Sequence, residues 1–172
     1  FGGWLDWGRG LRALLDLAAA NPRIELRLAG EGSDDIIREL TANPAVTYLG
    51  FLDHDAVLEE TRRCHFVPAL YDPARLINRY AASNKVAEAL AIGRPLLMNS
   101  EMEVARAIAA TQCAIVLPYR DVDQAWKRVE ALIGDWHAYL RACQAARRLF
   151  DERYAWAPVR GAIIAALRPP PD

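Results

Sequence analysis

The sequence has few of the residues that build disulfide frameworks, metal centres or nucleophilic triads. Its three cysteines, Cys64, Cys113 and Cys143, are odd in number, far apart and without CxxC spacing, so neither a disulfide framework nor a zinc site is expected. We expect them to be small core residues in a reducing compartment. The three histidines form no pattern with Ser, Cys or carboxylates that indicates nucleophilic or metal catalysis, and His54 is interpreted as a capping or surface loop residue.

The sequence also lacks a charge excess and a long apolar run. The formal net charge is -1 and the pI is near 6.4, so nucleic acid is not an expected partner. No apolar run approaches the roughly 20 residues that span a bilayer, and no signal peptide is recognised. With 172 residues, 53% of them hydrophobic, the chain is long enough for one well-buried domain.

Helical and strand patterns alternate along the chain up to Leu117. Strands are expected in the opening residues and at 24–29, 45–49, 65–70, 95–99 and 114–117, with helices at 11–20, 33–40, 56–64, 83–92 and 101–110. Further helices are expected at 121–133, 136–150 and 156–167. This order predicts an α/β domain with a doubly wound, Rossmann-like parallel sheet of about six strands and a helical C-terminus. The domain is expected to cover residues 1–168, with a disordered tail at 169–172. Because the first strand is short, we expect a preceding domain.

The helix expected at 83–92 contains polar residues where a core helix should have none. From 86 to 92 every side chain except Glu88 is apolar, which is typical of a buried helix. Lys85 lies in the first turn, where a cation opposes the helix dipole. An anion bound by the free amides of Ser83, Asn84 and Lys85 would reconcile the cation with this position.

A purely structural interpretation of the same segment stays open. In that alternative Ser83 caps the helix, Lys85 pairs with Glu88, and Gly93 begins the turn that ends the helix.

The loops that follow the strands are the candidate binding loops, because ligands of open parallel sheets sit beyond the carboxyl ends of the strands. The first loop, GGWLDWGRG, combines four glycines with Arg9, whose guanidinium suits phosphate, although an ordinary glycine-rich turn with a solvated Arg explains it too. The turn at 30–33 is explained equally well by tight-turn geometry.

These pieces, in this order, resemble the C-terminal, nucleotide-sugar-binding domain of GT-B glycosyltransferases, closest to the large retaining family 4. The similarity runs from Gly3 to about Trp156. It rests on GGWLDWGRG, LAGEG, VTYLGFLD, HFVPALYDP, SNKVAEALAIGRPLL and YAW.

The resemblance implies roles for particular residues. The first loop, including Gly3, and the Arg9-Gly10 pair match the family's diphosphate-binding loop, while the family's other loop Arg falls on Trp4. Amides at the start of the helix match the site of the donor's phosphate, and Lys85 would compensate for the cation lost at Trp4. Glu88 matches the Glu that binds the ribose hydroxyls, whereas the sugar-contacting Glu falls on Tyr80. The segments that border the base contain the residues Gly30, Gly32, Phe51 and Leu52.

The resemblance implies a hexosyltransferase-type enzyme in which Arg9, Lys85 and Glu88 are the expected catalytic residues. The donor would be a nucleotide-diphosphate sugar, UDP- or GDP-linked, and neither a metal nor another cofactor is expected. The acceptor, a glycan or lipid-linked glycan of cell-surface polysaccharide synthesis, would meet the missing N-terminal GT-B domain. The isolated domain is therefore expected to be inactive. The implied location is the cytoplasm, with peripheral association at the inner face of the membrane through the missing domain.

Three alternatives remain at this point. A degenerate GT-B domain could serve assembly or regulation without catalysis, which the loss of the first Glu at Tyr80 permits. A nucleotide-sugar epimerase shares the sheet but runs another reaction. An unrelated doubly wound domain, such as a receiver-like module, would need an acidic pair after its first strand, and that segment offers only Asp6.

Overall fold

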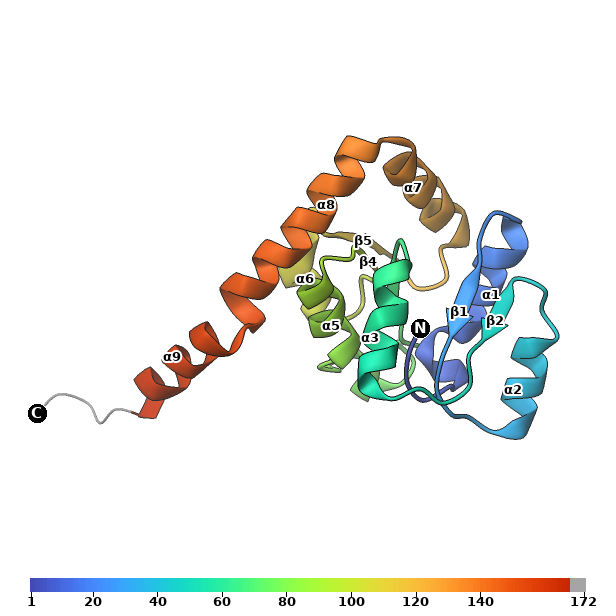
Figure 1. Cartoon of the computed structure of the whole chain (residues 1–172), viewed down its shortest axis with the longest axis horizontal. Helices are drawn as coiled ribbons and strands as arrows, with labels where there is room; N and C mark the ends of the chain where they lie inside the picture. The colour runs from blue at the N-terminus through green and yellow to red at the C-terminus, as the bar shows by residue number, and fades with distance from the viewer. Residues whose placement is uncertain (168–172) are drawn as a thin grey trace, which may run out of the picture.

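A computed structural model describes residues 1–167 (Figure 1). The strands are β1 (Leu26–Leu28), β2 (Val46–Tyr48), β3 (Val67–Ala69), β4 (Leu96–Asn99) and β5 (Ala114–Leu117). The helices of the first part are α1 (Leu11–Ala20), α2 (Asp34–Thr41), α3 (His54–Arg63), α4 (Leu76–Arg79), α5 (Asn84–Ile92) and α6 (Glu103–Ala109). They are followed by α7 (Val122–Gly134), α8 (Trp136–Leu149) and α9 (Trp156–Leu167). The alternation expected from the sequence is confirmed.

The strands are parallel but form two small sheets, with β1 beside β2 and the order β3-β4-β5 in the other. The opening residues, expected as a sixth strand, make only isolated parallel bridges, Gly2 to Ala29 and Leu5 to Gly32. Gly3 has a φ of 118°, which no regular strand contains, so pairing is interrupted there. Backbone hydrogen bonds join this segment to the end of β1, and the single sheet of the sequence prediction is found as two sheets.

Helices cover both faces of the larger sheet. Successive strand residues point to opposite faces, so each face contributes side chains to a different core. Leu97 and Ile115 face a core shared with α1 and α7, whereas Leu96 and Met98 face a core shared with α5, α6 and α8. This confirms the doubly wound arrangement. Cys113 is fully buried in the second core, as expected for a small core residue, while Cys64 and Cys143 are half-buried.

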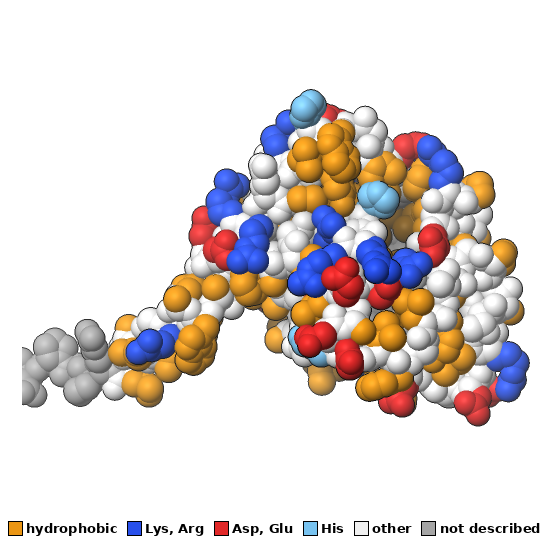
Figure 2. All heavy atoms as spheres, viewed as in Figure 1, with side chains coloured by type: hydrophobic (Ala, Val, Ile, Leu, Met, Phe, Trp, Pro, Cys, Tyr) orange, Lys and Arg blue, Asp and Glu red, His pale blue; other side chains and the backbone are white. Residues whose placement is uncertain are grey.

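The C-terminal part leaves the body of the domain. After α8 the chain makes a π-helical turn at Phe150–Tyr154, and α9 then projects away from the sheets without a buried residue (Figure 1, Figure 2). The end of the predicted domain at 168 and the predicted tail at 169–172 lie outside the described residues. Within residues 1–167, no helix has both the length and the apolar character that crossing a membrane requires.

Two helix caps explain why the elements next to the cleft begin and end where they do. Gly93 ends α5 with a φ of 73°, and its amide donates to the carbonyls of Ala89 and Leu90. At the start of α3 the side chain of Asp53 accepts a hydrogen bond from Ala56 N at 2.8 Å. The short helix α4, by contrast, lies in a segment that the sequence predicts as loop.

Candidate functional site

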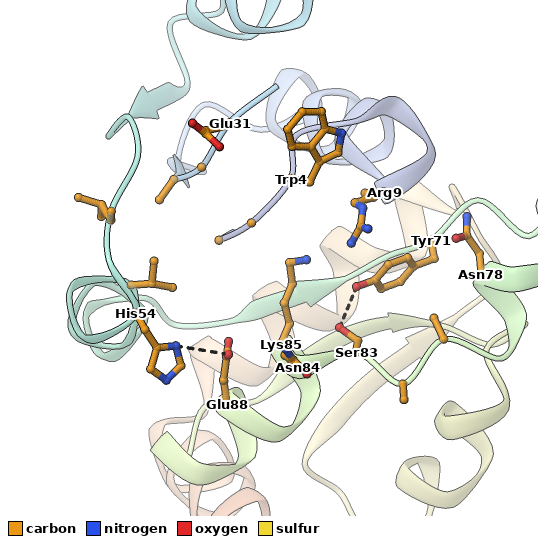
Figure 3. A pocket seen from close by; sticks show the side chains of 18 of the residues that line it. Trp4, Arg9, Glu31, His54, Tyr71, Asn78, Ser83, Asn84, Lys85 and Glu88 are labelled. Atoms are coloured by element: carbon orange, nitrogen blue, oxygen red, sulfur yellow. Dashed lines mark hydrogen bonds and ion pairs between the residues drawn. The ribbon is translucent and has the colours of Figure 1, made fainter. Parts of the chain in front are cut away.

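A cleft of about 790 Å³ opens where the loops after β1, β2 and β3 meet the first turn of α5 (Figure 3). It brings together all but one of the residues predicted for the site. Those that line it are Gly3, Arg9, Gly30, Phe51, Leu52, Tyr80, Ser83, Asn84, Lys85 and Glu88. The rule that ligands bind beyond the carboxyl ends of parallel strands therefore locates a real depression in this chain.

Gly32 is the predicted residue that does not line the cleft. A side chain there would meet the carbonyl oxygen of Leu5 at 2.7 Å, so Gly32 serves the packing of two loops. Gly30, at the cleft wall, also lies too close to another loop for a side chain. Its φ is 131°, and a Cβ would lie 1.9 Å from the carbonyl oxygen of Gly3. Only glycine allows these two loops to approach so closely.

The N-terminus of α5 opens into the cleft without a side-chain cap. Ser83 occupies the cap position in an extended conformation, but its side chain makes no capping hydrogen bond. Its hydroxyl instead shares a 2.7 Å hydrogen bond with the hydroxyl of Tyr71 (Figure 3). Ser83 is therefore the N-cap residue of α5 by position and backbone conformation, as the structural interpretation expects, but its side chain does not cap the helix. The first-turn amides of Asn84 and Lys85 are left for another acceptor.

Lys85 is a buried cation aimed into the cleft. Its residue is 8% exposed, and its Nζ lies 4.2 Å from the ring centroid of Phe1 and 5.7 Å from that of Tyr71. Burial lowers the pKa of Lys85 from its ordinary value of 10.5, Tyr71 partly offsets this, and the charge of Arg9 lowers the pKa further. Among the described residues Lys85 forms no ion pair, so the interpretation in which it pairs with Glu88 is also wrong.

Glu88 lies one turn further along α5 and faces His54 at the start of α3. Its side chain is 27% exposed, and its Oε1 lies 3.8 Å from His54 Nδ1. The interpretation of His54 as a capping or surface residue holds for its exposure but not for capping, since Asp53 caps α3. His54 lines the cleft. Its position directly after the loop of β2 was the signal that could have identified it.

Arg9 projects from a one-turn 3-10 helix, Trp7–Arg9, whose cap is Asp6. Its guanidinium carbon lies 6.0 Å from the ring centroid of Tyr71, so Tyr71 contacts both cations of the cleft. Tyr71 is only 5% exposed and was not predicted as a site residue. It is the second residue of the loop after β3, and this position was the available signal.

Exposed aromatic side chains surround the cations. Trp4 is 55% exposed, Phe51 72% and Tyr80 69%, and all three line the cleft. Trp4 lies on the same side as Arg9, across the cleft from Lys85 (Figure 3). Within residues 1–167 no group of three His, Cys, Asp or Glu side chains is placed to hold a metal ion. The cleft thus offers anion binding by two cations and two amides, together with the two carboxylates of Glu31 and Glu88.

The sequence matches the family described as "Glycosyl transferases group 1" over residues 9–135. The chain belongs to this family. No curated protein matches it significantly. Among solved structures, it is similar to Anabaena HepE in complex with UDP and glucose, with 15% identity and a TM-score of 0.78, covering 96% of this chain and 47% of that one.

Two further solved structures are similar. Sucrose-phosphate synthase from Thermosynechococcus elongatus has 15% identity and a TM-score of 0.76, over 96% of this chain and 45% of that one. The C-terminal domain of the group 1 glycosyltransferase LpcC from Francisella tularensis has 13% identity and a TM-score of 0.71, over 91% of this chain and 87% of that one. The chain thus spans about half the length of the first two proteins named and most of an isolated domain.

At these identities the structural likeness shows the fold, and the family match shows a glycosyltransferase group 1 domain. The match favours this class over the receiver-like and non-catalytic alternatives.

Proposed function

We propose that this chain is the C-terminal, donor-binding half of a retaining, family 4 type GT-B glycosyltransferase, and that its cleft binds a nucleoside diphosphate sugar. The observation that carries the proposal is the convergence of Arg9, Lys85 and the uncapped first turn of α5 beside Glu88. A buried lysine without an ion pair raises the free energy of the protein unless an anion binds. A diphosphate supplies that anion and accepts from the amides as well.

The arrangement also suits the chemistry of glycosyl transfer. Negative charge collects on the leaving diphosphate in the transition state, and cations and amides already aimed at it stabilise that charge. Arg9 and Lys85 hold the diphosphate between the first loop and α5. A hydrogen bond to a charged group is worth about 1.5 to 3 kcal/mol, so these contacts supply a large part of the donor's binding free energy.

Glu88 would bind the ribose hydroxyls of the donor. Its carboxylate lies one helical turn from Lys85 on the same face of α5, as residues three apart do. Phe51 and Leu52 would border the base, and Tyr80 would lie near the sugar. The HepE structures contain UDP, UDP with glucose, or UDP-glucose, which makes a UDP-sugar the first donor to test and a GDP-sugar the second.

The acceptor site would belong to an N-terminal domain. The chain covers 45% to 48% of sucrose-phosphate synthase and HepE, in agreement with half of a two-domain enzyme. We therefore expect the isolated chain to bind donor without transferring the sugar to an acceptor glycan or lipid-linked glycan. We also propose that the enzyme acts in the cytoplasm in polysaccharide synthesis and associates with the membrane through the other domain.

Isothermal titration calorimetry with UDP, GDP, ADP and dTDP, and then with their sugars, tests the proposal. We expect one diphosphate to bind and its affinity to fall in Arg9→Ala and Lys85→Ala. Arg79→Ala is the matched control, because Arg79 is exposed on α4 and does not line the cleft. No binding across the panel would contradict the donor site and favour a non-catalytic assembly module.

A further inference from the structure

Tyr71 and Ser83 share a 2.7 Å hydrogen bond between their hydroxyl groups at the start of α5. We propose that Tyr71 is a positioning residue that holds the Ser83 hydroxyl away from these amides and so keeps the N-terminus of α5 open to the diphosphate. The inference rests on the proposed function, because it assigns a role at the same site. It adds Tyr71, which contacts Ser83, Arg9 and Lys85, to the residues of the site.

The backbone of Ser83 already has the conformation of a capping residue. Its φ of -83° and ψ of 123° are those of a helix N-cap, and serine is among the residues most favoured there. A rotation of its side chain would let Oγ accept from the first-turn amides. That acceptor would occupy the groups on which an anion is expected to sit. A capped helix is more stable, but it is closed to the ligand.

Tyr71 can hold Ser83 because hydrogen bonds from the ends of neighbouring strands fix the backbone of Tyr71. Its amide donates to Asn99 Oδ1 at 2.8 Å, and Asn99, at the end of β4, is 1% exposed. Asn99 Nδ2 in turn donates to Glu101 Oε2 at 3.0 Å. The Glu101 carboxylate accepts from Tyr119 N, after β5, at 3.1 Å. The loops that end β3, β4 and β5 are thereby joined through one buried amide side chain.

The ring of Tyr71 has a separate effect from its hydroxyl. Arg9 and Lys85 lie within 6.0 Å and 5.7 Å of its centroid, and the negative face of a phenol attracts both cations. This attraction offsets part of the repulsion between two like charges. The phenylalanine variant therefore removes the hydroxyl while it keeps the ring.

Three variants test the proposal: Tyr71→Phe, Ser83→Ala and the double variant. Calorimetry would use UDP and inorganic pyrophosphate as probes, and thermal unfolding without ligand would be followed in parallel. In Tyr71→Phe the freed Ser83 caps α5, so we expect affinity for both probes to fall about two- to thirtyfold, the range that a serine cap is worth. The Tm without ligand should rise in the same variant.

The double variant gives the decisive result. Because alanine cannot cap, Tyr71→Phe with Ser83→Ala should bind both probes as tightly as Ser83→Ala alone and should lose the gain in Tm. If Tyr71 only supports the structure, Tyr71→Phe would lower Tm, and adding Ser83→Ala would not restore binding. Tyr154→Phe, a half-buried tyrosine away from the cleft, is the matched control.

The two proposals fail in different ways. Equal affinity in the wild type and Tyr71→Phe would overturn the positioning role and leave the donor site standing. Loss of affinity without rescue in the double variant would also overturn it. A wild type that binds neither UDP nor pyrophosphate would overturn both proposals.

Discussion

His54 and Glu88 face each other across one end of the cleft, with His54 Nδ1 3.8 Å from Glu88 Oε1 (Figure 3). They come from the start of α3 and the middle of α5. At this distance the contact is too long for a hydrogen bond. The Glu88 carboxylate therefore keeps its acceptor capacity for hydroxyl groups of a ligand.

Substitution of Glu88 by Gln should separate nucleoside from phosphate recognition. If Glu88 binds the ribose, Glu88→Gln lowers UDP affinity by roughly tenfold to a hundredfold, since a hydrogen bond to a charged group is worth about 1.5 to 3 kcal/mol. The affinity for inorganic pyrophosphate, which has no ribose, should not change. Calorimetry with both probes measures the difference.

The control for this variant is Glu103→Gln, since Glu103 is exposed at the start of α6 and pairs only with Arg106 among the described residues. It should bind both probes as the wild type does. A parallel loss of UDP and pyrophosphate affinity in Glu88→Gln would mean that Glu88 supports the phosphate groups, and the ribose assignment would have to be abandoned.

Lys85→Met should make the protein more stable and bind diphosphate less well. Methionine fills a similar volume without a charge in a site that burial makes unfavourable for the ammonium. We expect Tm at neutral pH to rise and the affinity for UDP to fall about tenfold to a hundredfold. Lys127→Met, at an exposed position of α7, should change neither. An unchanged affinity in Lys85→Met would remove Lys85 from the site.

The lowered pKa of Lys85 predicts how the free energy of unfolding depends on pH. Because it is lowered in the folded state, the unfolded chain binds more protons between that value and 10.5. The contribution of Lys85 to the free energy of unfolding therefore rises as pH increases through this window. Urea titrations at alkaline pH should show the rise in the wild type relative to Lys85→Met, in which this contribution is absent. Equal pH dependence in both proteins would contradict the assignment.

The sequence predicts the helices of this domain well because their signals are local. The helix expected at 83–92 is found at Asn84–Ile92, ended by Gly93 in the left-handed conformation that glycine favours. The two cations of the cleft were also predictable, since Arg9 and Lys85 both lie where strand order places binding loops.

Other features depend on contacts that local patterns do not contain. The bond between Tyr71 and Ser83 and the approach of His54 to Glu88 join residues from different elements. Capping propensity places Ser83 correctly at the N-cap of α5, but it does not show that the hydroxyl bonds to Tyr71 in place of the first-turn amides. The division of the sheet into two likewise depends on strand pairing between distant segments, and the φ of 118° at Gly3 cannot be deduced from the apolar pattern around it.

Gly10→Ala should destabilise the domain through the first loop. Gly10 has a φ of 78°, and a Cβ would lie 2.6 Å from the carbonyl oxygen of Leu70. Backbone strain of this kind costs about 1 to 3 kcal/mol, and the clash with Leu70 adds to it. Gly134→Ala is the matched control, because Gly134 is the last residue of α7 with open space around it, and the free energy of unfolding should change by less than about 0.5 kcal/mol. Chemical denaturation measures both changes, and equal effects would refute the argument from the close approach.

Glu101→Gln should reduce the loss of thermal stability that occurs as pH falls. Burial alone would raise the pKa of Glu101, but hydrogen bonds from Tyr119 N and the Asn99 amide outweigh it and lower the pKa. A carboxylate with a lowered folded pKa contributes stability above its ordinary value of 4.5, and this contribution is lost as pH falls through the folded value. The Tm of the wild type should therefore drop more steeply below pH 4.5 than that of Glu101→Gln, whereas Glu103→Gln should follow the wild type. Superimposable acid profiles of the wild type and Glu101→Gln would show that this carboxylate does not join the strand ends in solution.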